Sequence, residues 1–320
     1  MQEIHKENIL EVARYSDISP QGLQNTLEAT TYPKQKDWKN LLRYSLLALG
    51  LGFTVTGIVF FFAYNWADLP KFTKLGLVQG LLIIVSLAAL SPRLSLITRN
   101  CILTGASVLV GLLFAVFGQI YQTGANAYDF FLAWTVFIAI WVLVARFAPL
   151  TLGFITLLNM TIILYSQQVA KDWSFATIVS LLFLLNSLIA AGTYWLNSRT
   201  ANAKTSSWFT HVLVLAAATY ATIGIIWLIL EHEPAVISYV LPILYFVVGA
   251  ATVYYAISTK KTYHLAVIAV SLISIVSALL IRRIDNGEGI FLLLTIFIII
   301  YVTLTIKGLL SLQQKWRDHA

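Results

Sequence analysis

Two short polar segments interrupt the apolar first half of the sequence, and they hold the residues best suited to bind a small molecule. Side-chain amides and hydroxyls form hydrogen bonds, and aromatic rings stack on apolar surfaces, so such a set suits a neutral or amphipathic ligand. We expect the two segments to form one pocket if they lie on the same face of the protein. The candidate binding residues are Asn65, Trp66 and Asp68 in residues 62–70, and Gln119, Tyr121, Gln122 and Asp129 in residues 118–129.

Each segment also has a simpler interpretation. Trp and Tyr at the end of a membrane helix settle at the level of the lipid headgroups, in which case Asn65 is a helix C-cap. The second segment contains no Lys or Arg, and Gly118 and Gly124 permit tight turns. It is either a surface loop or a loop that dips back toward the bilayer, where protein or water must satisfy its backbone. Both interpretations stay open for both segments.

Arg282 and Arg283 form a separate charged group. We interpret them as contacts for lipid phosphate, for an acidic partner, or for Asp68 or Asp129. They also define a competing function, a membrane enzyme acting on lipid or envelope precursors, with one of these carboxylates as base and an arginine holding a phosphate. No GxSxG, Walker, HExxH or CxxC motif occurs. The sequence therefore leaves the catalytic residues unknown and predicts no cofactor, and of the two classes it favours a protein that is not an enzyme.

Metal and proton chemistry also lack support. Glu231, His232 and Glu233 are adjacent, and three successive residues cannot all face one ion on a helix, so no metal site is predicted. No Asp, Glu, Lys, Arg or His falls near the centre of an apolar run, which disfavours a proton-coupled carrier. The polar residues within the runs are Gln79, Asn159 and Asn186, which we expect to hydrogen-bond between helices.

The elements that position these residues are membrane helices. The chain is 59% hydrophobic and 11% charged, against about 45–50% and about 25% in soluble proteins. A bilayer core of about 30 Å needs about 20 apolar residues in a helix. The hydropathy predicts an all-α integral membrane bundle of about ten transmembrane helices. The predicted spans are 44–64, 74–91, 100–118, 130–147, 150–166, 174–195, 209–230, 236–257, 263–281 and 289–310.

The distribution of Lys and Arg predicts the orientation. Because cytoplasmic loops are enriched in these residues, the side with the larger count is cytoplasmic. Near the spans, fourteen lie on the side of the N-terminus: Lys34, Lys36, Lys39, Arg43, Arg93, Arg99, Arg146, Arg199, Lys204, Lys260, Lys261, Lys307, Lys315 and Arg317. Only Lys71, Lys74, Lys171, Arg282 and Arg283 lie on the other side. Both termini are thus predicted to be cytoplasmic and both polar segments to face outward, and the scattered charge of +7 does not indicate nucleic-acid binding.

The polar N-terminal sequence predicts a small cytoplasmic helical hairpin. We predict one helix over residues 4–15 and a second with Ser19 as N-cap and Pro20 at its first position. The predicted domains are the hairpin at 1–40, a transmembrane domain at 41–312 and a cytoplasmic tail at 313–320. We expect the hairpin to lie on the lipid bilayer or to dock a partner protein.

The two polar segments also carry a resemblance to a known family. The strings from Ala63 to Pro70 and from Gly118 to Ala125, with Tyr128 and Asp129, resemble the signatures of predicted bacterial membrane proteins with domain of unknown function 2157. The Ile18-Ser19-Pro20 turn is similar as well. The resemblance implies a bacterial cytoplasmic membrane and supports the two-segment site, but it brings no activity.

Three functions remain open. The favoured one is binding or moving a small neutral or amphipathic molecule through the outward site. The alternatives are the membrane enzyme and a non-catalytic sensor or assembly component that acts through the hairpin.

Overall fold

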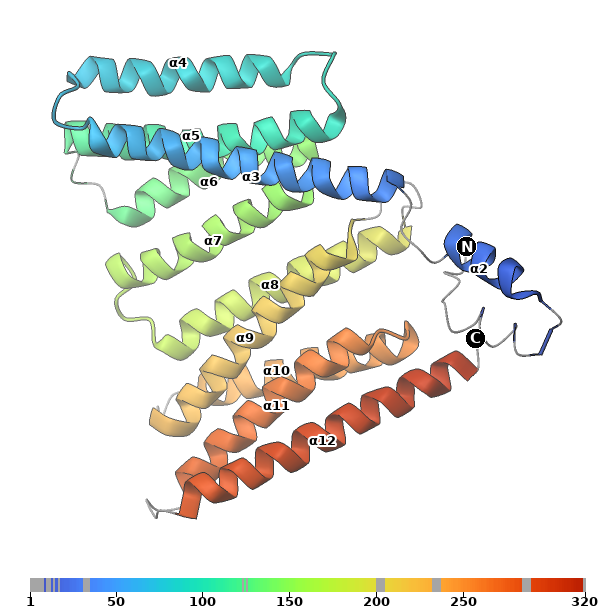
Figure 1. The fold of residues 1–320 in the computed structure, drawn as a ribbon. Helices are drawn as coiled ribbons and strands as arrows, with labels where there is room; N and C mark the ends of the chain where they lie inside the picture. The colour runs from blue at the N-terminus through green and yellow to red at the C-terminus, as the bar shows by residue number, and fades with distance from the viewer. Residues whose placement is uncertain are drawn as a thin grey trace. The chain divides into compact units, whose positions relative to one another are not determined.

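The computed structural model describes residues 9, 13, 15–16, 18–30, 35–122, 124, 126–199, 205–231, 237–283 and 289–318. All regular elements within these residues are helices (Figure 1). Ten of them are long and apolar enough to cross a membrane. In hydrocarbon a chain must satisfy its backbone hydrogen bonds internally, which a helix does. The predicted all-α membrane bundle is therefore confirmed, and its environment is a lipid bilayer.

The ten long helices follow the predicted spans, and the first, third and last of them extend clearly beyond their spans. Backbone hydrogen bonding continues into the polar flanks, so hydropathy alone underestimates helix length. The elements are α2 (Pro20–Thr30), α3 (Gln35–Tyr64), α4 (Lys71–Ala89), α5 (Leu96–Tyr121), α6 (Ala127–Ala145), α7 (Ala148–Gln168), α8 (Phe175–Arg199), α9 (Ser207–Glu231), α10 (Ile237–Ser258), α11 (Thr262–Arg283) and α12 (Gly289–Asp318).

The second helix of the predicted hairpin begins as its sequence indicates. The hydroxyl of Ser19 accepts a hydrogen bond from the N–H of Gly22 at 3.1 Å, and Pro20 is the first residue of α2. This is the N-cap arrangement that satisfies an otherwise unpaired donor. The predicted helix over residues 4–15 lies largely outside the described residues.

The chain divides into two compact units, residues 1–120 and 121–320, which are described separately. In the first unit, α3, α4 and α5 share a small buried core of Phe62, Val78 and Val116. Trp66, after α3, and Ile120, near the end of α5, pack against this core. Near the middle of α3, Leu51 approaches Gly105 of α5 so closely that a Cβ at position 105 would lie 2.6 Å from the Leu51 Cδ1.

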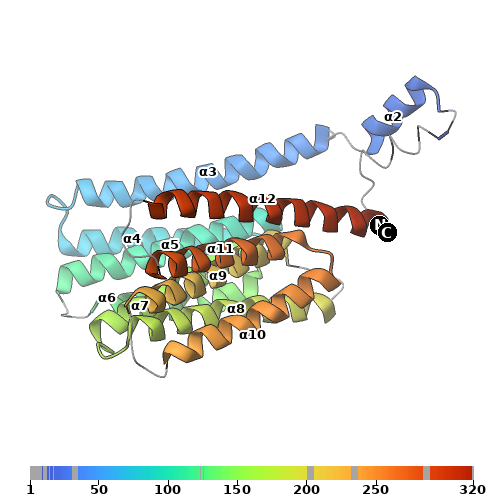
Figure 2. The same cartoon turned by 90° about the horizontal axis from the view of Figure 1, so that it is seen from below.

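In the second unit, α9 packs against both α8 and α11 (Figure 1), and α10 contacts all three of these helices (Figure 2). Their shared core includes Phe183, Ala221, Leu241 and Ile275. The pair α6 and α7 is joined by a very short link, in which Arg146 adopts a left-handed conformation with φ 46°. Pro149 lies in the first turn of α7, so the predicted separation of these two spans is confirmed.

Candidate functional site

The first predicted segment forms the end of α3 and a turn. The side-chain amide of Asn65 donates to the carbonyl of Phe61 at 2.9 Å, as expected of a residue that closes a helix. Trp66 is half-buried, and the Lys74 ammonium lies 4.0 Å from the centre of its ring. This cation–π contact helps to offset the cost of holding Lys74 at 7% exposure. Asp68 is exposed.

The second predicted segment is mostly helical, which corrects its assignment as a loop over residues 118–129. Helix α5 runs to Tyr121 and α6 begins at Ala127. Gln119 and Tyr121 are thus exposed helical residues, and Gln122 follows with φ 43°. The carboxylate of Asp129 accepts a hydrogen bond from the N–H of Asn126 at 3.1 Å. A carboxylate in the first turn stabilises the N-terminus of α6, so Asp129 has a structural role.

The predicted binding residues belong to both units. Asn65, Trp66, Asp68 and Gln119 lie in the first, and Tyr121, Gln122 and Asp129 lie in the second. The single outward pocket formed by the two segments therefore stays a prediction. Arg282 and Arg283 are exposed in the last turn of α11, where cations are favourable. Their contact with phosphate or lipid also stays a prediction.

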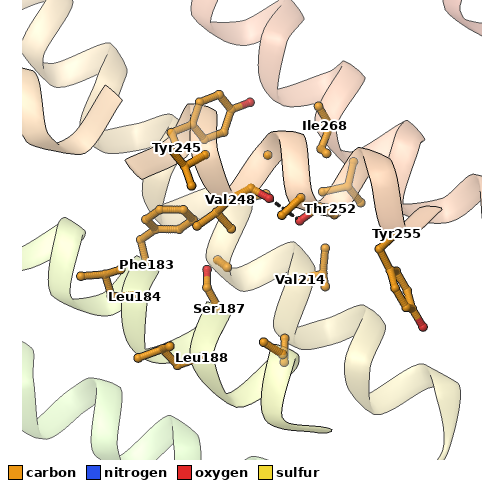
Figure 3. Close-up of a pocket in the computed structure, with 18 of the residues that line it drawn as sticks. Phe183, Leu184, Ser187, Leu188, Val214, Tyr245, Val248, Thr252, Tyr255 and Ile268 are labelled. Atoms are coloured by element: carbon orange, nitrogen blue, oxygen red, sulfur yellow. Dashed lines mark hydrogen bonds between the residues drawn. The ribbon is translucent and has the colours of Figure 1, made fainter. Parts of the chain in front are cut away.

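The second unit contains a cavity of about 410 Å³ between α8, α9, α10 and α11 (Figure 3). Small residues on three helices leave room for it, among them Ala191, Ala218 and Gly249. The rest of the lining is mostly apolar. Phe183 and Tyr245 lie at one end of the cavity and Tyr255 at the other (Figure 3). The sequence did not reveal this cavity.

The Ser187 hydroxyl is the unusual polar group of the lining. Elsewhere on α8, Ser180 and Thr193 donate to carbonyls one turn earlier, at 2.6 and 2.7 Å. The buried Oγ of Ser187 finds no hydrogen-bond partner among the described residues. It points toward the side of the cavity that carries Val248 and Thr252 (Figure 3). A buried hydroxyl without a partner costs about 1–3 kcal/mol, so Ser187 is a local cost to the packing of α8.

Other polar groups near Tyr245 are fully satisfied. Its hydroxyl lies 2.7 Å from the Ser271 hydroxyl, which lies 2.6 Å from that of Thr222. Thr222 donates in turn to the carbonyl of Ala218 at 2.6 Å. This chain of hydroxyls joins α9, α10 and α11 beside the end of the cavity that Tyr245 lines.

The opposite end of the cavity borders an aromatic and basic cluster. Tyr194 and Tyr255 line the cavity, with ring centres 4.5 Å apart. The hydroxyl of Tyr194 hydrogen-bonds Nε2 of His264, which is 0% exposed. Lys261 donates to the Tyr255 hydroxyl at 3.1 Å. His211 lies beside this group, with its ring centre 5.6 Å from that of His264.

Sequence reasoning missed this cluster, although a signal was present. Tyr194, His211, Tyr255 and His264 fall at successive span ends, and counting spans puts those ends on one side of the membrane. In the part of the chain that the structure describes, no group of three or more His, Cys, Asp and Glu side chains is placed to hold a metal ion.

The helices and the cavity within them define a polytopic α-helical membrane protein. Residues 12–151 match the model of a family described as predicted membrane protein (DUF2157), which confirms the predicted resemblance. Searches of curated proteins and of solved structures found no match.

Proposed function

We propose that this protein binds a small amphipathic molecule and holds its apolar part in the cavity between α8, α9, α10 and α11. The cavity itself carries the proposal. Its volume of about 410 Å³ falls in the usual range of ligand pockets, about 300–1,000 Å³. Its apolar lining lies within four membrane spans, where a charged ligand would be costly and an alkyl chain would not.

The length of the cavity suits the alkyl chain of a molecule that occupies one leaflet of the bilayer. Along α8 the lining runs from Phe183 to Tyr194, about 16 Å at about 1.5 Å per residue. This length is about half of a hydrocarbon core of about 30 Å.

The proposal includes an orientation in a bacterial cytoplasmic membrane. Both termini are cytoplasmic, because fourteen Lys and Arg residues flank the spans on that side and five on the other. In this orientation the end of the cavity at Tyr194 and Tyr255 faces the cytoplasmic leaflet. The N-terminal hairpin is then available to a cytoplasmic partner protein.

Photolabelling of the full chain in lipid nanodiscs tests the proposal. The probe is a hexadecanol analogue with a diazirine in its chain, and labelled peptides are identified by mass spectrometry. Ala250 and Ala251 provide a matched pair, since both are exposed on α10 but only Ala251 lines the cavity. We expect labelling of α8 and α10 that unlabelled hexadecanol displaces, that Ala251→Phe reduces severalfold, and that Ala250→Phe leaves unchanged. Equal labelling of both variants would show that the cavity is not the site.

A further inference from the structure

Lys261 places a positive charge at one end of the cavity. Its ammonium lies 5.3 Å from the ring centre of Tyr255 and 5.4 Å from that of Tyr194, and both tyrosines line the cavity. The residue follows Lys260 in the short link between α10 and α11. The charge therefore lies beside the two tyrosines at this end of the cavity, near the ends of α10 and α11.

The charge of Lys261 is not neutralised by the described residues around it. Its side-chain contacts there are the Tyr255 hydroxyl, at 3.1 Å, and the two tyrosine rings, and none of these is a carboxylate. Because the Tyr255 oxygen accepts from Lys261, its own O–H stays available to donate. An ammonium and a phenol hydroxyl side by side are two donors suited to one anionic group.

The neighbouring imidazole fixes this arrangement. His264 is fully buried and hydrogen-bonds the Tyr194 hydroxyl, which holds that ring in place at the end of the cavity. Its Nδ1 has no partner among the described residues. Within the described residues, the same end of the cavity thus carries a cation, a hydroxyl proton without an acceptor and a positioned aromatic ring.

We propose that the occupant of the cavity is a long-chain fatty acid whose carboxylate is held by Lys261 and the Tyr255 hydroxyl. This inference rests on the proposed function. One ammonium matches the single charge of a carboxylate. A phosphomonoester head carries about −1.5 to −2 charges and three strong acceptor oxygens, more than these two donors satisfy. The alkyl chain extends past Ser187 toward Phe183 and Tyr245.

A palmitate analogue with the same chain diazirine as the hexadecanol probe tests this assignment in nanodiscs. Wild-type protein is labelled by each probe while unlabelled palmitate or unlabelled hexadecanol competes. We expect palmitate to compete at a concentration at least about tenfold lower than hexadecanol, and Lys261→Gln to abolish that preference, as loss of a charge-assisted bond predicts. Lys261→Arg should restore it. Lys260→Gln is the matched control, since the Lys260 ammonium donates to the carbonyl of Trp316, whereas that of Lys261 donates to the hydroxyl of Tyr255, which lines the cavity.

The outcomes separate the two proposals. If hexadecanol labels the cavity but palmitate competes no better, the head-group assignment is wrong and the proposed function stands. If neither probe distinguishes Ala251→Phe from Ala250→Phe, the proposed function fails. If Lys261→Gln weakens both competitors equally, Lys261 supports the fold and does not recognise a carboxylate. Lysophosphatidic acid is a further competitor, and a preference for it over palmitate would replace the carboxylate with a phosphate.

Discussion

Asn159 and Asn186 exchange hydrogen bonds through their side-chain amides between α7 and α8. The Asn186 amide donates to the Asn159 oxygen at 3.0 Å, and the reverse donation spans 3.4 Å. Both residues are buried, at 8% and 1% exposure. This confirms the expectation that these two amides connect helices. The pair satisfies polar groups that hydrocarbon could not, and it fixes the register of one span against the next.

The asparagine pair should show coupled stability. Asn186→Ala should destabilise more than Asn159→Ala, because Asn186 also donates to the carbonyl of Leu182 at 2.8 Å. The coupling free energy in a double-mutant cycle should be about 0.6 kcal/mol and at most about 1.7 kcal/mol, as for other hydrogen bonds between membrane helices. Unfolding in mixed micelles measures it. Strictly additive effects would show that the mutual bonds contribute nothing.

Gly224 should tolerate no larger side chain. A Cβ at this position of α9 would lie 2.5 Å from side-chain carbons of Val179 and Leu241. Gly224→Ala should therefore destabilise the second unit by about 1–3 kcal/mol, the usual cost of overpacking. Gly192→Ala on α8 is the control, because nothing lies within 4 Å of its Cβ position. Thermal unfolding of the two variants compares them, and equal melting temperatures would contradict the close approach of these helices.

The sequence revealed the spans more fully than the site, for physical reasons. Long apolar segments can cross a bilayer only as helices that satisfy their own backbone, so the ten spans were predictable. The hydrogen bonds of the buried amide pair were predictable because both asparagines lie within apolar spans. The ends of the helices were less predictable, because Gln119 and Tyr121 are polar and still belong to α5. The cavity depends on which small residues meet across four helices. The contact of Tyr194 with His264 joins residues 70 positions apart, which hydropathy does not encode.

The proposed orientation predicts which positions a reagent can reach from outside. In a Cys101→Ser background, Asp68→Cys should react with a membrane-impermeant maleimide in intact cells. Ser206→Cys should react only after permeabilisation, since it lies between α8 and α9. Both positions are exposed, so access and not burial determines labelling. The opposite pattern would reverse the orientation, and with it the leaflet that the Tyr194 end of the cavity faces.

Removing the Tyr194 hydroxyl should destabilise the protein, because the buried His264 would lose the partner of its Nε2 while its Nδ1 already has none among the described residues. An unsatisfied buried polar group costs about 1–3 kcal/mol, so Tyr194→Phe should lower the free energy of unfolding by about that amount. The matched control is Tyr254→Phe, since Tyr254 is 76% exposed and its loss of a hydroxyl leaves no buried group without a partner. Unfolding in mixed micelles distinguishes the two. A Tyr194→Phe variant as stable as the control would mean that His264 is satisfied in another way, and Tyr194 would then line the cavity without being fixed by the imidazole.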